Sequence, residues 1–509
     1  MLVILYEALL SDAAVWRRLW TLGWLQYLLW TTLALTLLTT SCALVLGVAL
    51  AWLVERTELP GRRWWSGLLA APLIIPGYLV VIAYESLAGP WGLAARAFKA
   101  LGWLCLADAL PEIEGFGGAL LVLTLGAYPY VYLLVAAALR GMSSSFEDAA
   151  RTAGRSVWKI FWTVTLPLAR PALTASALLV ALTVLADFGV VERMRFPTFT
   201  TAVYHQLTSR FDRSTAASLS AVLIGGTLIL LWAQLRLWGS GRYYFRADRR
   251  PHERRDLGSW RWPTLLLVTL VLALALAVPI VVFSFWLIED WLNPVRAPAF
   301  WGTGWTDLLR HAGHGVLSAG LAATLALMLA LPMAFLAVRH PKRRWGSALS
   351  WLSQAGFVLP GVLVALALAY GLSRYVPYLY FNFAALVIAY VVLFFPLALQ
   401  ALETGLSQVP QQLEESARLL RHGTLGVWRR VTLPLLLPAT IAGWVLVFTN
   451  ALRELPATLL LRPAGFDTLP VRIWIAAGEG FFAHAAAPAL LLILLSLPLL
   501  FLLRGARLS

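Results

Sequence analysis

Long apolar runs separated by short clusters of Arg, Pro and Gly set the pattern of this chain. A helix needs roughly 20 apolar residues to cross the hydrocarbon core of a bilayer. Runs near that length fall at about 28–54, 66–89, 117–139, 171–190 and 217–238, and then at 263–288, 313–338, 347–373, 382–402, 437–460 and 484–503. The pattern predicts an all-α integral membrane protein with about six spans in each half of the chain.

The first half has one run fewer than the second. The fragment MLVILYEALL at the start of the chain resembles the outer end of a span such as VPIVVFSFWLIED at 278–290. We therefore expect the first span to be truncated. A short interfacial helix is the alternative for this fragment.

Two charged stretches interrupt the apolar pattern, at 147–173 (EDAARTAGRSVWKIFWTVTLPLARPAL) and at 414–440. In the ungapped register that places Glu147 on Glu414, 10 of the 26 positions between 147 and 172 are identical. A repeat of six spans begins and ends on the same side of the membrane, so the halves should be parallel copies. We expect permease-like domains at 1–238 and 263–509, joined by a polar, basic linker at 239–262.

Sidedness follows from the distribution of basic residues. If both charged stretches lie on one side, that side holds 26 of the 40 Lys and Arg residues. Cytoplasmic loops carry such an excess, so this side is assigned to the cytoplasm. The net charge of +15 then reflects membrane topology. We expect membrane lipid as a partner and no nucleic acid.

The first charged stretch is predicted to form a short helix over 147–153. Ser145 is its expected cap, Glu147 and Asp148 lie in the first turn, and Gly154 ends the helix. A second short helix is expected from about Ser156. Its apolar face needs a protein partner or a lipid surface, and two acids followed by a glycine favour a docking element over an interfacial helix.

EDAARTAG followed by TLPLARPAL, with EESARLLR and TLPLLLPAT in the second half, resembles the EAA motif of permease subunits in binding-protein-dependent ABC importers. The resemblance implies two coupling helices, each inserted into a groove of a cytoplasmic ATPase subunit. The implied coupling residues are Glu147, Asp148, Ala150, Arg151 and Gly154 in the first half, and Glu414, Glu415, Ala417 and Arg418 in the second. Arg421 stands where the motif has its glycine.

The same resemblance implies the partners. Two docking elements imply two copies of the ATPase, an extracytoplasmic binding protein supplies substrate, and the location is the bacterial inner membrane. None of the three lysines, Lys99, Lys159 and Lys342, lies in a G-x-x-x-x-G-K-[ST] loop. We therefore expect no enzyme and no cofactor in this chain, with ATP and Mg bound by the partner subunits.

Four further segments, LVERTELPGRRWW, LIIPGYLV, FPTFTTAVY and RELPATLLLRPAGFDTL, look most like the ferric-iron importers. Thiamine importers share the fused plan, and phosphonate or polyamine systems are similar, so these substrates remain alternatives. An ion-coupled secondary transporter can also have parallel halves, but it would not need matched docking stretches. No catalytic constellation supports a membrane-embedded enzyme.

Candidate pathway residues come from acids at membrane depth. Asp187 and Glu454 are equivalent in the register that places Glu147 on Glu414. They either line a cation route or cap the outer ends of their helices near Arg193 or Arg453. Glu85 is a weaker candidate, and the helix-breaking pairs Pro76-Gly77 and Pro360-Gly361 line a pathway or form packing kinks.

Two further features concern ligands on the outer side. His311 and His314 lack carboxylate or thiolate support, so no metal site is expected there. The outer segments 191–216 and 461–483 are expected to hold the binding protein, because they follow the spans linked to the coupling stretches.

Overall fold

The computed structural model describes residues 2–10, 13–89, 92–238, 254–293, 304–340, 360–419 and 423–498. Over these ranges the chain is helical. Within these ranges, β-type pairing is limited to one isolated bridge between Thr57 and Arg255. Seven helices in the described ranges are long and apolar enough to span a membrane, and two bent helix pairs raise that number to nine. The prediction of an all-α, multi-pass membrane protein is confirmed.

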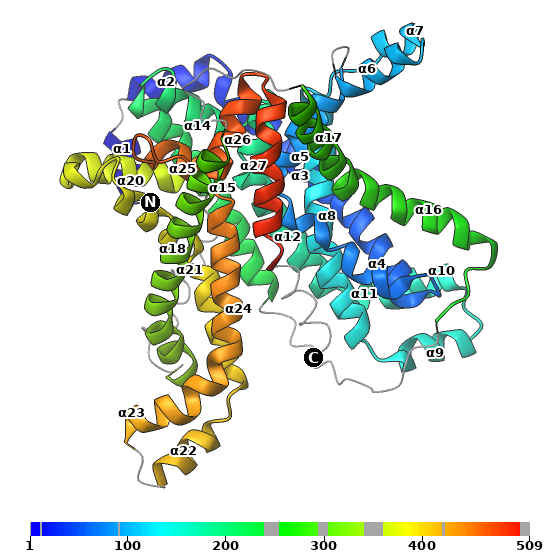
Figure 1. The fold of residues 1–509 in the computed structure, drawn as a ribbon. Coiled ribbons are helices and arrows are strands. Elements are labelled where there is room, and N and C mark those ends of the chain that lie inside the picture. Colours follow the sequence, from blue (N-terminus) through cyan, green and yellow to red (C-terminus); the bar gives the residue numbers. More distant parts are fainter. Residues whose placement is uncertain are drawn as a thin grey trace. The chain divides into compact units, whose positions relative to one another are not determined.

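The described helices group into two compact units, the first formed by Glu7–Trp286 and the second by Met1–Tyr6 with Leu287–Ser509. Each is considered by itself, with elements labelled as in Figure 1. The elements within the first unit are α2 (Ala13–Thr21), α3 (Trp24–Arg56), α4 (Arg62–Leu68), η1 (Ala71–Ile74), α5 (Gly77–Leu87), α6 (Leu93–Ala100), α7 (Leu104–Asp108), α8 (Phe116–Gly141), α9 (Ser144–Thr152), α10 (Val157–Ile160), η2 (Phe161–Thr165), α11 (Leu166–Leu168), α12 (Arg170–Ala186), α13 (Gly189–Arg193), α14 (Phe199–Thr208), α15 (Arg213–Trp238), η3 (Gly258–Trp260), α16 (Arg261–Leu272) and η4 (Ala273–Ala277).

The second unit repeats much of this order. Its elements are α18 (Trp305–Arg339), α20 (Gly361–Tyr375), η6 (Pro377–Leu379), α21 (Phe383–Gln408), α22 (Gln411–Leu419), α23 (Thr424–Val427), η7 (Trp428–Thr432), α24 (Leu433–Leu452), α25 (Pro456–Leu461), α26 (Leu469–Gly478) and α27 (Phe482–Leu495). Two helices, α1 (Leu2–Leu10) and α17 (Val278–Leu292), cross the division between the units.

The compact units do not divide the chain where the repeat does. The span expected at 263–288 groups almost entirely with the first unit, although it belongs to the second repeat. Of the linker predicted at 239–262, residues 239–253 lie outside the described ranges, and Arg255 pairs with the backbone beside the end of α3. The domain limits stay a prediction, because spatial grouping and sequence repetition need not change at the same residue.

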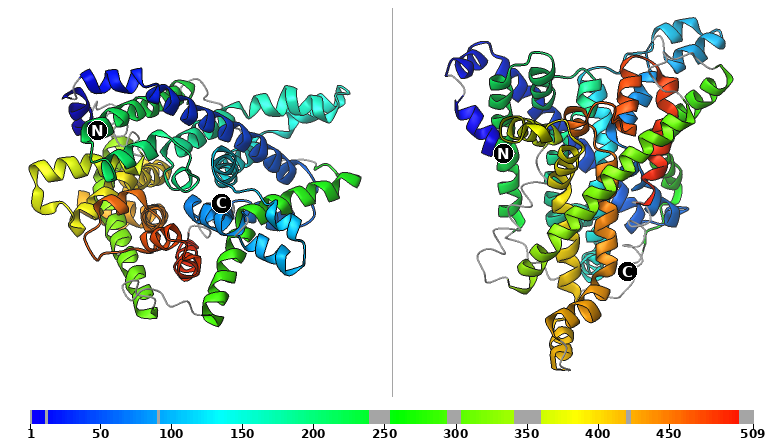
Figure 2. Two further views of the ribbon diagram at one scale, coloured as in Figure 1. Left: turned by 90° about the horizontal axis from the view of Figure 1, so that it is seen from above. Right: turned by 60° about the vertical axis from the view of Figure 1, so that its left-hand side comes forward.

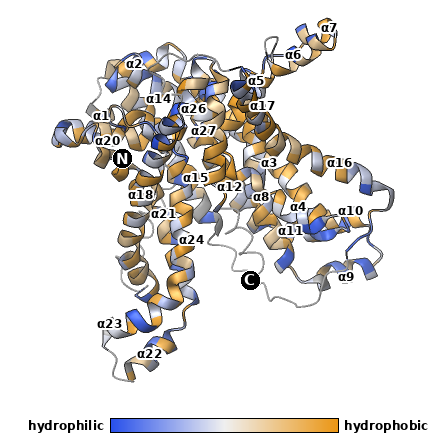
Figure 3. Ribbon diagram, viewed as in Figure 1, coloured by the Kyte–Doolittle hydropathy of each residue, from blue (hydrophilic) through white to orange (hydrophobic). Residues whose placement is uncertain are grey.

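The repeat is reproduced in the element boundaries. The register that places Glu147 on Glu414 superposes the first and last residues of α8 on those of α21, of α9 on α22, of α10 on α23, and of η2 on η7. An inserted pair of short helices, α6 and α7, follows α5, whereas the corresponding connection after α20 contains only η6. The long helices are mostly hydrophobic, and hydrophilic residues gather at α9 and α10 and at α22 and α23 (Figure 3).

Three predicted spans are interrupted in the structure. The span at 66–89 is bent by 89° between Ile74 and Gly77. Pro76, which lacks a backbone N–H, is the N-cap residue of α5. The spans predicted to end at 190 and 460 end instead at Ala186 and Leu452, each followed by a separate short helix.

Three long helices pack against one another in each unit, α3 with α8 and α12, and α18 with α21 and α24 (Figure 1 and Figure 2). Small residues permit the close approach, as is common between helices in membranes. On α18 the buried stripe is Ala323, Ala326, Ala330 and Ala334. On α3 a Cβ added at Gly47 would lie 2.5 Å from the Cβ of Val131 on α8.

The contact at Gly47 gives a testable prediction. Gly47→Ala should force α3 and α8 apart, because Val131, which the added Cβ would meet, belongs to the packed helix α8. Overpacking of this kind costs about 1–3 kcal/mol. A lower thermal midpoint of the purified chain in detergent would show it. Gly126→Ala on α8 is the matched control, since a Cβ there meets nothing within 4 Å, and an equal loss in both variants would contradict the packing account.

Candidate functional site

The first charged stretch folds as two short helices joined at a glycine. Ser143 caps α9, because its Oγ accepts the backbone N–H of Ser145 at 3.3 Å. The expected cap, Ser145, lies inside the first turn instead. The helix ends at Thr152, and Gly154, just after its C-cap residue Ala153, has a φ of +72° that favours glycine. The next residue, Arg155, donates its N–H to the Ala150 carbonyl, which closes the end of α9.

The second charged stretch has the same form. Its helix α22 covers the predicted coupling residues Glu414, Glu415, Ala417 and Arg418, and α23 follows after a short connection. Arg421, which replaces the glycine of the motif, lies outside the described residues. The two stretches therefore present equivalent helices at equivalent points of the repeat.

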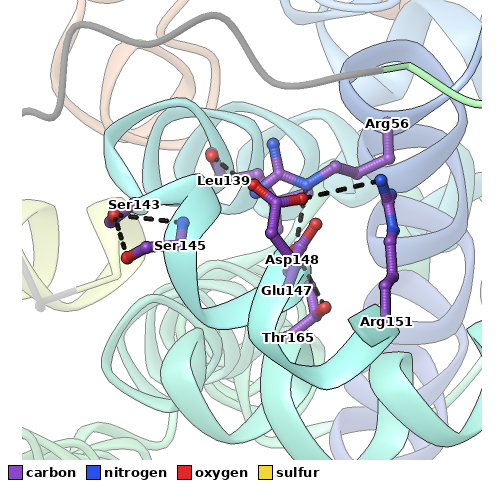
Figure 4. Close-up of polar contacts among 8 residues, drawn as sticks. All are labelled: Arg56, Leu139, Ser143, Ser145, Glu147, Asp148, Arg151 and Thr165. Atoms are coloured by element: carbon purple, nitrogen blue, oxygen red, sulfur yellow. Dashed lines mark hydrogen bonds and ion pairs between the residues drawn. The ribbon is translucent and has the colours of Figure 1, made fainter. Parts of the chain in front are cut away.

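The Glu147 carboxylate is buried beneath α9 and held from two sides (Figure 4). Its Oε1 accepts the Arg56 Nε–H at 3.2 Å and the Thr165 hydroxyl at 3.0 Å. Arg56 also donates to the Leu139 carbonyl at 3.0 Å, near the end of α8. The side chains of Arg56 and Glu147 are each only 6% exposed. One buried oxygen thus connects α9 to the end of α3 and to η2.

The second unit builds the same arrangement. Glu414 Oε1 accepts an Arg339 Nη2–H at 2.8 Å and the Thr432 hydroxyl at 3.2 Å. Arg339 ends α18 and also donates to the Val409 carbonyl at 3.0 Å. We call each set of Arg, Glu and Thr a coupling triad: Arg56, Glu147 and Thr165 in the first unit, and Arg339, Glu414 and Thr432 in the second.

A π-helical turn accompanies each triad. The turns η2 and η7 end at Thr165 and Thr432, the hydroxyl donors of the two triads. A π turn inside an α-helix is uncommon and is frequently found at functional sites. Each turn lies between the short helices of its charged stretch and the next long helix, α12 or α24, so the chain from α9 or α22 to that long helix passes through it.

The triads correct one part of the sequence interpretation. The acids Glu147 and Glu414 were expected among the residues of the two docking elements that couple to the ATPase, but both are buried and paired within the chain. The exposed face of α9 consists instead of residues such as Phe146, Asp148 and Arg151. On α22 it includes Leu413 and Glu415, and Leu413 is the repeat equivalent of Phe146.

Sequence reasoning did not assign Arg56 or Arg339. Each is the last residue of a long helix and stands a few residues before a proline, in LVERTELP and LAVRHP. That shared pattern was the available signal. The register that superposes the two charged stretches places Arg56 on Ala323, so an ungapped comparison does not align the two arginines.

Asp187 and Glu454 each cap the short helix that follows. Asp187 Oδ1 accepts the Val190 N–H at 2.9 Å, and Glu454 Oε1 accepts the Ala457 N–H at 3.1 Å. Neither arginine weighed as a partner is bonded to these acids: Arg193 donates to Glu85, and Arg453 donates to the Thr449 carbonyl. Both acids remain partly accessible.

The two Pro-Gly pairs bring a helix end to each of these acids. Gly77 and Gly361 begin α5 and α20. A Cβ on Gly77 would lie 3.8 Å from Asp187 Oδ2, and one on Gly361 would lie 2.4 Å from Glu454 Oε1. The positive end of a helix dipole favours a nearby carboxylate. In each unit, therefore, a Pro-Gly helix start and an acid meet.

The two histidines of HAGH have separate surroundings. His314 stacks on Phe466 with ring centroids 4.1 Å apart, and its Nδ1 lies 3.0 Å from the Asp467 carbonyl oxygen. His311 faces a cavity that is described below. Within the described ranges no group of three or more His, Cys, Asp or Glu side chains is placed to hold a metal ion.

Comparison with known proteins places this arrangement in a family. Residues 13–237 and 326–507 each match the binding-protein-dependent transport system inner membrane component. An Fe(3+)-transport system permease protein of Haemophilus influenzae is 30% identical over 474 residues, covering 92% of this chain and 88% of its own length. A ferric transport system permease protein of Actinobacillus pleuropneumoniae is 23% identical, over 89% of this chain and 67% of its own.

Shorter matches concern single repeats. The molybdenum transport system permease protein ModB of Escherichia coli is 28% identical over 171 residues, which is 31% of this chain and 69% of that protein. The family match covers most of the chain and occurs once in each half. The chain is a multi-pass inner-membrane protein with two copies of one permease domain, and it belongs to the family of inner membrane components of binding-protein-dependent transport systems.

Proposed function

We propose that this chain is the permease subunit of an ABC importer that passes ferric iron from an extracytoplasmic binding protein to the cytoplasm. The relatives that match most of both chains include ferric-iron permeases by name, and one from Sinorhizobium fredii that is named only as a probable ABC transporter permease protein. Permeases named for molybdenum or 2-aminoethylphosphonate match smaller shares of this chain, which makes another solute the weaker alternative. The observation that carries the permease role is the pair of equivalent coupling triads.

On this proposal α9 and α22 each dock on one copy of a cytoplasmic ATPase. ATP and Mg bind in those subunits, and this chain performs no hydrolysis of its own. The exposed apolar side chains Phe146 and Leu413, 57% and 46% exposed, supply matched contacts for the two grooves. Asp148 and Arg151 are exposed on the same short helix as Phe146.

The triads explain how such docking reaches the membrane. A buried carboxylate stays charged only when a counter-charge and hydrogen bonds replace its water. Glu147 therefore fixes α9 to the ends of α3 and α8, and Glu414 fixes α22 to α18 in the same way. A displacement of the coupling helices by the ATPases moves the long helices with them. Alternating access then follows if ATP binding and hydrolysis favour different arrangements.

The pathway proposal concerns the acids at the ends of α12 and α24. Asp187 and Glu454 hold negative charge close to Gly77 and Gly361, at breaks in the helical path. Oxygen ligands suit a hard trivalent cation, so these carboxylates line its route in our proposal, with Glu85 farther out beside Arg193. The binding protein contacts the outer segments 191–216 and 461–483.

A double-mutant cycle tests the triad. Glu147→Gln leaves the buried Arg56 without its counter-charge, and removing one partner of a buried pair costs about 3–5 kcal/mol. We expect a lower thermal midpoint and an ATPase rate that no longer responds to loaded binding protein. Arg56→Met added to Glu147→Gln should make neither measurement worse, because both changes remove one interaction. Additive losses would contradict the triad.

The docking face is tested separately from the triad. Phe146→Ala with Leu413→Ala should reduce copurification of the ATPase with the permease and leave the thermal midpoint nearly unchanged, because both side chains are exposed. Trp158→Ala is the matched control, since Trp158 is a 72% exposed aromatic residue outside α9. Equal retention of the ATPase by the double variant and the wild type would rule out these contacts.

The pathway acids are tested by removing charge while keeping the cap. In Asp187→Asn and Glu454→Gln the amide oxygen still accepts the backbone N–H, so the fold should persist. We expect ferric-iron uptake by proteoliposomes holding the complete importer to fall about tenfold or more, the loss that one charged contact implies. Asp212→Asn is the control, because Asp212 caps α15 with the same chemistry. Unchanged uptake would leave the two acids with capping alone.

A further inference from the structure

The second unit contains a cavity of about 410 Å³ that the transport role does not use. It lies between the end of α17, the start of α18, and the neighbouring helices α26 and α27, which run side by side in Figure 1 and Figure 2. Its polar lining comes from Asp290, His311, Arg472 and His484, and Trp291 and Trp305 stand beside them. Such a volume is typical of a small-ligand site.

The cavity lies at the level of the outer membrane interface. The apolar run of α17 ends at about 288, immediately before Asp290 and Trp291. At the other end of the bilayer, Arg339 belongs to the cytoplasmic triad. The helix α18 has 35 residues, about 52 Å at 1.5 Å per residue, so its first turns extend beyond a hydrocarbon core of roughly 30 Å.

The surface beside the cavity is apolar and exposed. Trp291 and Trp305, which line the cavity, are 80% and 76% exposed, and their neighbours Ile288 and Leu309 are 56% and 65% exposed. Tryptophan is enriched at the membrane interface because its ring is apolar and its N–H is polar. A lipid molecule could therefore place its head in the cavity and its chains along this exposed apolar surface.

The charges inside the cavity are of opposite sign. Arg472 supplies a guanidinium and Asp290 a carboxylate. His484 Nδ1 lies 3.8 Å from Asp290 Oδ1. The other ring nitrogen of His484, Nε2, is buried without a hydrogen-bond partner among the described residues, and the side chain is only 9% exposed. Buried polar atoms normally have a partner, so this nitrogen indicates a bound water or ligand.

We propose that this cavity binds the headgroup of a zwitterionic phospholipid that carries a primary ammonium, of the phosphoethanolamine type. The phosphate binds Arg472 with help from the imidazoles, and the ammonium binds Asp290. Guanidinium groups suit phosphate, and a primary ammonium donates hydrogen bonds that a trimethylated one cannot. Arg472 Nη1 also lies 3.5 Å from Asp467 Oδ2, so the phosphate would share the guanidinium with that carboxylate. A zwitterionic headgroup offers a charge of opposite sign to each of the two lining charges.

Native mass spectrometry of the full chain tests this proposal. The chain is extracted into detergent with equal amounts of phosphatidylethanolamine, phosphatidylcholine and phosphatidylglycerol of identical acyl chains. We expect phosphatidylethanolamine to be retained about tenfold over phosphatidylcholine, the factor that one charge-assisted hydrogen bond gives. Equal retention of the three lipids, or a preference for phosphatidylglycerol, would overturn the proposal.

Three variants and one competitor complete the test. Asp290→Asn should abolish the preference for ethanolamine over choline, whereas Asp108→Asn, the same charge change in a residue of the first unit that is paired with Lys99, should retain it. Ala487→Leu fills the cavity and should reduce retention of all three lipids. Retained preference in Asp290→Asn contradicts the assigned contact. Displacement of the lipid by free phosphoethanolamine at equal concentration would instead identify a soluble ligand and refute the lipid assignment.

Discussion

Burial of a carboxylate at the ends of the long helices, beside the two charged stretches, is the constraint on which the rest of this protein depends. Glu147 and Glu414 lie in the first turns of short surface helices, yet their charges are enclosed. An enclosed charge requires a fixed partner, and Arg56 and Arg339 provide it from the last residues of α3 and α18. The short helices α9 and α22 are consequently integral parts of the helical bundles, and their position follows that of the spans.

Much of the structure around the two charged stretches was predictable, because the residues that form it are spaced in the same way in both halves of the chain. The helices α8 to α10 recur in the second half as α21 to α23 with identical lengths and connections, so an ungapped comparison detected them. Arg56 and Arg339 escaped it because the inserted helices α6 and α7 make the chain between Arg56 and α8 longer than the chain between Arg339 and α21. The burial of Glu147 and Glu414 could not be predicted from the sequence either, because an acid at the start of a helix is favourable whether it faces water or a guanidinium.

The outer half of the bundle was harder to predict. Asp187 and Glu454 were paired correctly by the repeat, but sequence alone left two roles open for each. The structure assigns both a capping contact and places Gly77 and Gly361 against them, a proximity between segments far apart in sequence. The 89° bend before Gly77 similarly depends on packing, because a proline is compatible with a gentle kink as well as with a full break.

The helical pair α6 and α7 gives the two halves different outer surfaces. It carries Leu101, Trp103, Leu104 and Leu106 with their side chains more than half exposed, and the corresponding connection of the second unit is a single short turn. Permeases assembled from two identical subunits cannot differ in this way, because any insertion would appear twice. Fusion into one polypeptide removes that restriction. Each half can then acquire its own surface helices, such as α6 and α7, while the buried triads stay the same in both halves.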